Sequence, residues 1–176
     1  MTLQDPHLID LGNELGKKID SITQYNSKPY FRTALKKLAL ITPENANTIC
    51  DYILAEQVEM NFKESTKEGE MKVLIWLSNY LANNKSFRQT TKQDILYYLN
   101  NLKRPVSEDP THRWIGSYNG RQMILNKFFR WLYAPDTRPK ERITPTCMQG
   151  VKKLPRQVES PYKPSSLWDS RENAIS

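Results

Sequence analysis

Hydroxyl, amide and guanidinium side chains alternate with large apolar ones between Trp114 and Tyr133. The apolar residues recur at helical spacing and predict a helix with one face on a core: Tyr118, Leu125, Phe128, Phe129 and Leu132. The remaining faces carry Ser117, Asn119, Arg121, Asn126, Lys127 and Arg130. Arginine and lysine bind phosphates, and arginine or asparagine can also pair with base edges. The stretch therefore favours a helix against a nucleic acid, while a solvated amphipathic helix fits it equally well.

Two further basic groups precede this stretch. Lys63, Lys67 and Lys72 lie near an expected helix start, where free N–H groups favour a phosphate. Glutamates interleave with these lysines, so a salt-bridged face is an even alternative. Lys85, Arg88 and Lys92 surround the next helix start without an acid before Asp94, and they are the better phosphate candidates.

The C-terminal stretch adds basic residues that could follow a duplex backbone: Arg138, Lys140, Arg142, Lys152, Lys153 and Arg156. We take as candidate DNA contacts Lys67, Arg88, Lys92, Arg113, Ser117, Asn119, Arg121, Lys127, Arg130, Lys152 and Lys153.

The formal net charge of +7 is distributed unevenly along the 176 residues. Residues 1–84 hold 9 Lys and Arg against 11 Asp and Glu, residues 85–156 hold 15 against 5, and residues 157–176 hold 2 against 3. A concentrated basic segment is typical of proteins that neutralise phosphates and release condensed counterions. Charge alone does not separate DNA from RNA or an anionic membrane, although it favours nucleic acid.

The sequence contains no recognisable catalytic or metal-binding pattern. His7 and His112 are the only histidines, and Cys50 and Cys147 form no CxxC pair. Phosphate-binding glycine motifs and a nucleophile elbow are absent from the sequence. We therefore expect a cytoplasmic protein without a cofactor, disulfide, signal peptide or membrane span, and without enzymatic activity of its own.

Capping residues and apolar spacing predict several helices along the chain. Thr42-Pro43-Glu44 is a helix start, and Thr91 with Asp94 forms a second one of the capping-box kind. Helices are expected over 28–41, 43–61, 65–83, 91–105 and 114–134, with Ile49, Tyr52, Ile53 and Val58 facing inward from the second. Frequent prolines after residue 138 predict an extended linker. The expected fold is all-α: an arm over 1–41 that can include a short helix, a compact four- to five-helix domain over 42–137, and a basic linker and tail over 138–176.

The order of these signals resembles a known family. Four motifs follow one another in an order that resembles the N-terminal, SAM-like core-binding domain of tyrosine recombinases. They are Ser65-Thr66, Thr91-Lys92-Gln93-Asp94-Ile95, Ser117-Tyr118-Asn119-Gly120-Arg121 and Leu125-Asn126-Lys127-Phe128-Phe129-Arg130-Trp131-Leu132. Within this phage-integrase family, the chain most resembles the integrase-like proteins of archaea. Ile143-Thr144-Pro145 and Gly150-Val151-Lys152-Lys153-Leu154-Pro155 resemble the linker that precedes its catalytic half. The likeness covers about residues 42–168.

The resemblance implies half of a clamp around duplex DNA. Ser117 and Arg121 fall where the family has DNA-facing groups, and Lys67 falls near the start of its other DNA-facing helix. Met71 stands where an aromatic residue is usual, and Glu68 and Glu70 crowd that face. The family's cleavage domain would begin after Leu167-Trp168-Asp169, so no nucleophilic tyrosine is expected among residues 1–176.

The expected function is sequence-selective binding of double-stranded DNA in integration and recombination, without cleavage. The first alternative is a helical interaction protein that dimerises or docks another recombinase protomer. The second is a small helix-turn-helix regulator, which the longer helices disfavour.

Overall fold

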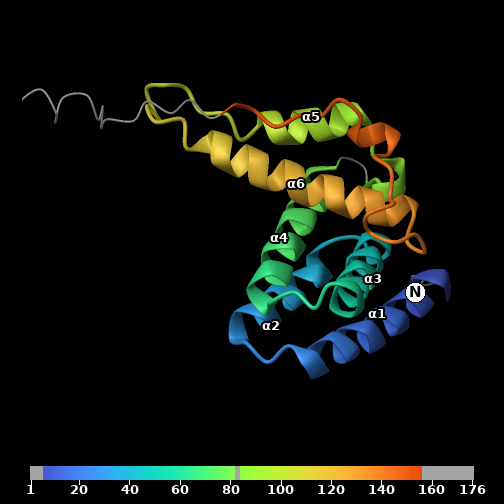
Figure 1. Ribbon diagram of the computed structural model, residues 1–176. Coiled ribbons are helices and arrows are strands. Elements are labelled where there is room, and N and C mark those ends of the chain that lie inside the picture. Colours follow the sequence, from blue (N-terminus) through green and yellow to red (C-terminus); the bar gives the residue numbers. More distant parts are fainter. Residues whose placement is uncertain (1–5, 82–83, 156–176) are drawn as a thin grey trace, which may run out of the picture.

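The computed structural model describes residues 6–81 and 84–155, and these residues form helices and loops without a strand (Figure 1). The elements in chain order are α1 (Pro6–Tyr25), α2 (Pro29–Lys36), the short 3-10 helix η1 (Lys37–Leu40), α3 (Pro43–Glu59), α4 (Glu64–Tyr80), η3 (Phe87–Gln89), α5 (Lys92–Asn100), α6 (Trp114–Tyr133) and η4 (Thr146–Met148). The predicted all-α class is confirmed. None of the helices in the described ranges is both long and apolar enough to span a membrane.

The helix starts predicted at Thr42 and Thr91 are present, whereas α4, expected from Ser65, begins at Glu64 with Lys63 at its N-cap. The Thr42 hydroxyl accepts the N–H of Asn45, and Pro43 occupies the first turn of α3. At α5, Thr91 accepts the Asp94 N–H while the Asp94 carboxylate accepts the Thr91 N–H at 2.7 Å. These reciprocal bonds satisfy N–H groups that a helix start leaves free.

The segment before residue 28 differs from the expected arm. Residues 6–25 form α1, which lies along α3 (Figure 1). Ile22 of this helix is buried, and Lys18 is ion-paired with Asp51 of α3 at 2.8 Å. Leu15, Ile19 and Ile22 recur at helical spacing and pack on the core, so this segment has an apolar stripe, and its packing against α3 stabilises the helix.

The buried face of α3 also corrects one prediction. Ile49, Tyr52 and Ile53 are buried as expected, whereas Val58 is 88% exposed. The buried stripe continues from Tyr52 to Glu56, one helical turn later, and Val58 lies on the opposite side of the helix. A carboxylate therefore takes the inward position that the sequence pattern assigned to a valine.

Helix α6 joins two groups of elements. The lower group comprises residues 6–81 with α1 to α4, and the upper group comprises residues 84–155 with α5, α6 and the segment after α6 (Figure 1). The Phe128 ring of α6 packs edge to face on two other rings. The distance between ring centres is 5.2 Å to Tyr52 of α3 and 5.0 Å to Phe87 of η3. The predicted apolar stripe of α6 is buried throughout, so this aromatic contact lies in the common core.

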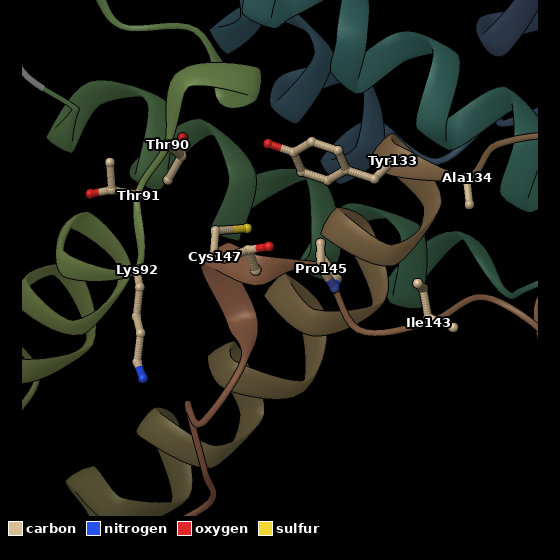
Figure 2. A pocket seen from close by; sticks show the side chains of 9 residues that line it. Thr90, Thr91, Lys92, Tyr133, Ala134, Ile143, Pro145 and Cys147 are labelled. Atoms are coloured by element: carbon tan, nitrogen blue, oxygen red, sulfur yellow. The ribbon is translucent and has the colours of Figure 1, made fainter.

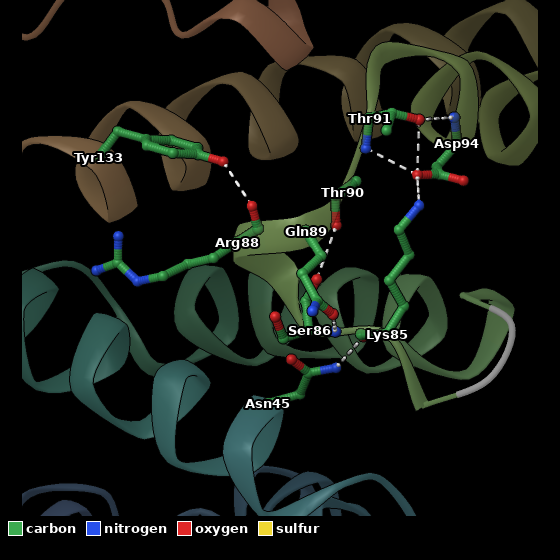
Figure 3. A network of polar contacts seen from close by, with 9 residues as sticks. All are labelled: Asn45, Lys85, Ser86, Arg88, Gln89, Thr90, Thr91, Asp94 and Tyr133. Atoms are coloured by element: carbon green, nitrogen blue, oxygen red, sulfur yellow. Dashed lines mark hydrogen bonds and ion pairs between the residues drawn. The ribbon is translucent and has the colours of Figure 1, made fainter.

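Asn45 is the polar junction between the two groups (Figure 3). Its side-chain amide is 1% exposed, and its Nδ2 donates to the Ser78 hydroxyl at 2.9 Å and to the Lys85 carbonyl at 3.1 Å. Its Oδ1 accepts the Phe87 N–H at 3.0 Å. One side chain thus connects α3, α4 and the segment that leads to α5.

We predict that Asn45→Ala lowers the free energy of unfolding by about 2–4 kcal/mol, because the buried groups around Phe87 and Lys85 lose their partners. Chemical denaturation followed by circular dichroism measures the change. Asn79→Ala, an exposed asparagine on α4, is the control and should stay within about 0.5 kcal/mol of the wild type. Equal stabilities of the two variants would contradict the role given to Asn45.

Candidate nucleic-acid interface

The charge of the chain is divided between the two groups. The lower group contains 9 Lys and Arg against 10 Asp and Glu, and the upper group contains 14 against 5. The basic excess found in the sequence is therefore gathered on one part of the fold.

Lys127 is used inside. Its Nζ lies 2.5 Å from Glu56 and 2.7 Å from Glu70, and 4.2 Å from the centre of the Phe62 ring. The Tyr52 hydroxyl donates to Glu70 at 2.8 Å. Burial raises the pKa of Glu56, and the bond with Lys127 opposes that rise. Lys127 thus compensates two carboxylates on α3 and α4, which gives it a structural role, and its contact with DNA stays a prediction.

Three more candidate contacts have internal partners. Lys67 is 5% exposed, lies 5.9 Å from the Phe31 ring, and has a pKa lowered by burial. Asn119 donates to the Leu154 carbonyl at 2.9 Å and accepts the Leu154 N–H at 2.8 Å. Arg130 donates from Nε to the Arg142 carbonyl at 2.6 Å. All of these contacts lie within the protein, so the three side chains have a structural role that does not require DNA.

The segment after α6 packs against the protein instead of extending from it. Cys147, Met148 and Val151 are buried, and the Gln122 side chain donates to the Val151 carbonyl at 2.9 Å. Prolines prevent a long helix here, as predicted, but they do not prevent packing. The predicted linker is therefore a strap over residues 138–155, while residues 156–176 of that prediction lie outside the described residues.

Arg142 stabilises the bend at which the chain leaves α6 and enters the strap. Its guanidinium is paired with Glu59 of α3 at 2.6 Å, and the residue is 5% exposed. Its Nε donates to the Ala134 carbonyl and its Nη2 to the Pro135 carbonyl, both at 3.0 Å. A planar guanidinium can satisfy several acceptors at once, so this one side chain closes the bend that follows α6.

Four exposed cations border the strap and the start of α5. They are Arg88, Lys92, Lys152 and Lys153, and we call them the basic strip. Gly150 has a φ of +76°, and a Cβ added there would lie 2.9 Å from the Lys92 Nζ, so Lys92 lies directly beside the strap. Lys152 and Lys153 are held between buried Val151 and anchored Leu154. Within the described ranges, none of the four has an ion-pair partner.

Asp94 lies close to the strip but is occupied. It is ion-paired with Lys85 at 2.6 Å and bonded to Thr91 (Figure 3). Burial raises the pKa of Asp94, whereas the bonds with Lys85 and Thr91 lower it, and the pKa falls overall. The carboxylate therefore stays ionised and neutralises Lys85 rather than the strip.

The other candidates lie at the first half of α6. Arg113 and Ser117 are exposed, and Arg113 lies 3.9 Å from Asp109. Arg121 donates to the Tyr98 hydroxyl at 3.1 Å and stacks on Trp76, 4.5 Å from the ring centre. Trp76 and Tyr80 were not among the predicted site residues, although their four-residue spacing on α4 indicates a shared helix face.

A pocket of about 570 Å³ adjoins the strip (Figure 2). Thr90, Lys92, Tyr133, Ile143 and Cys147 are among the residues that line it. Burial raises the pKa of the Cys147 thiol to about 11, which makes it a poor nucleophile at neutral pH. The described residues contain no cluster of three His, Cys, Asp or Glu that could hold a metal ion.

Comparisons of the chain with protein-family models, curated proteins and solved structures found no match. The resemblance to recombinase core-binding domains therefore stays a prediction from sequence motifs.

We predict that Arg142→Ala releases the strap, because Glu59 and two backbone carbonyls lose their buried donor. Breaking a buried pair on one side costs about 3–5 kcal/mol. Hydrogen exchange should show faster exchange over residues 143–155, with smaller changes in α3 and α4. Arg138→Ala, which removes a side chain 86% exposed, is the control. Unchanged exchange of the strap in Arg142→Ala would show that Arg142 does not hold it.

Proposed function

We propose that this chain binds double-stranded DNA through its upper group and does not cut it. The observation that carries the proposal is the basic strip: four solvent-exposed cations without ion-pair partners among the described residues, located on η3, α5 and the strap, with Lys92 beside Gly150 of the strap. Phosphates of a duplex are the partners that such a strip neutralises, with release of bound counterions.

The packing of the strap supports this proposal. Lys152 and Lys153 lie on backbone that Gln122 and Asn119 of α6 hold by hydrogen bonds. Because the backbone is already ordered, a phosphate contact requires less ordering than on a free tail. Lys92 adds an exposed cation at the start of α5, beside Gly150 of the strap.

Three tyrosines are poor candidates for a nucleophile. Burial raises the pKa of Tyr52, Tyr98 and Tyr118, so these three phenols resist the deprotonation that a nucleophile undergoes. The motif resemblance supports a DNA target that undergoes integration or recombination. In that setting the chain contributes positioning on the duplex.

A second candidate function is docking of another protein chain, such as a recombinase protomer. The pocket beside the strip favours it, because Ile143 and Tyr133 on its wall are 81% and 46% exposed. Light scattering that shows a concentration-dependent oligomer, together with no affinity for DNA, would select this candidate over DNA binding.

We predict salt-dependent binding of a fluorescently labelled duplex, measured by anisotropy at low ionic strength. Each phosphate contact contributes about −0.9 to the slope of log K against log salt, so the variant Lys152→Ala with Lys153→Ala should flatten the slope by roughly 2 and weaken binding. Lys92→Ala should flatten it by about 1.

The matched control replaces Lys36 and Lys37, two adjacent exposed lysines of the lower group, with alanine. It removes the same charge and should leave the slope unchanged. An equal loss in the control pair would place binding outside the strip, and absence of duplex binding by the wild type at micromolar protein would refute the proposal.

A further inference from the structure

Two aromatic side chains occupy the solvent face of α4. Trp76 and Tyr80 are 44% and 40% exposed, while most residues of the helix from Lys67 onward are buried. The two lie four residues apart, so their side chains share one stripe of the helix surface. Large aromatic rings left in water at one place mark a binding surface more often than isolated ones do.

Arg121 links this stripe to two other helices. Its guanidinium carbon lies 4.5 Å from the centre of the Trp76 ring and 5.6 Å from that of Tyr98. The Tyr98 and Tyr80 rings meet edge to face at 5.6 Å. We call these four residues, contributed by α4, α5 and α6, the aromatic corner.

The guanidinium in this corner is fixed but not fully used. Arginine has five N–H donors, and among the described residues Arg121 donates to the Tyr98 hydroxyl. Stacking on Trp76 holds its plane, which leaves other donors for a ligand. If the stack served only to stabilise the fold, we would expect the indole to be covered by protein. Instead, Trp76 is 44% exposed.

The combination of groups selects the ligand class. The positive charge of Arg121 disfavours a cationic ligand, and a phosphate alone would leave the indole unused. A nucleobase has a flat π face for Trp76, acceptor atoms on its edge for Arg121, and an adjoining phosphate that suits the basic upper group. Paired bases inside a duplex cannot present their faces, so the ligand is an unpaired base.

We propose that the aromatic corner stacks an unpaired base of DNA. This inference rests on the proposed function for the charge that attracts DNA, but it concerns a separate surface. Arg121 follows Asn119 by two residues, which is about 200° around the helix axis. Asn119 contacts the strap and Arg121 contacts α4, so the strip and the corner lie on different sides of α6.

The test compares two probes of equal length and charge, an oligothymidylate and an abasic oligomer. Wild-type protein should bind the oligothymidylate more tightly and show quenching of tryptophan fluorescence. Trp76→Ala should weaken binding of the oligothymidylate roughly 5- to 100-fold, with little effect on the abasic probe. Arg121→Lys keeps the charge but loses the flat stacking group, so it should also reduce the preference for the base-containing probe.

Tyr30→Ala is the matched control, because Tyr30 is 43% exposed on α2 of the lower group. Trp76→Phe keeps an aromatic ring and should retain part of the preference, which covers the case in which Trp76→Ala fails to fold. Equal affinity of the wild type for both probes, or a preference that survives in both Trp76 variants and in Arg121→Lys, would overturn the inference.

The outcomes separate this inference from the proposed function. If duplex binding is absent but the wild type prefers the base-containing probe and the corner variants lose that preference, the proposed function fails and the corner stands. If the strip variants weaken duplex binding while both probes bind the wild type equally, the corner fails and the proposed function stands.

Discussion

The buried guanidinium of Arg142 fixes the path of the chain after α6, and the surface argued to bind DNA depends on that path. Its bonds to Glu59 and to the carbonyls of Ala134 and Pro135 turn the backbone back toward α5. The turn brings Lys152 and Lys153 to the side of the protein where Lys92 lies. A buried charge of this kind is costly unless it is fully paired, so the bend is specific as well as stabilising.

Basic residues of the upper group have two different roles: some pair with buried carboxylates, and others face solvent. Lys127 and Arg142 reach carboxylates of the lower group, across 57 and 83 residues of sequence. Lys92, Lys152 and Lys153 face solvent and keep their charge available. The net charge of the upper group therefore overstates the number of cations available to a partner. Which cations are already paired inside the protein decides where a polyanion can bind.

Local patterns were sufficient to predict much of the fold. The caps at Thr42 and Thr91 and the apolar stripe of α6 are short-range signals, and the structure contains them as expected. The packing of α1 and of the strap was missed because it depends on contacts with distant elements. Helical spacing from Ile49, Tyr52 and Ile53 already places Val58 on the outer side of α3. The burial of a carboxylate at Glu56, in contrast, depends on Lys127, which lies far along the chain. The pairing of Trp76 with Arg121 joins two helices in the same way, so neither residue type nor spacing on one helix could have revealed it.

Amide chemical-shift mapping tests directly whether duplex DNA binds on the upper group beside the strap. Titration of the isotope-labelled protein with a duplex should shift amide signals around Arg88, Lys92 and residues 150–154, with signals of α1 to α3 unmoved. Shifts concentrated in α1 to α3, or spread evenly over both groups, would contradict the account.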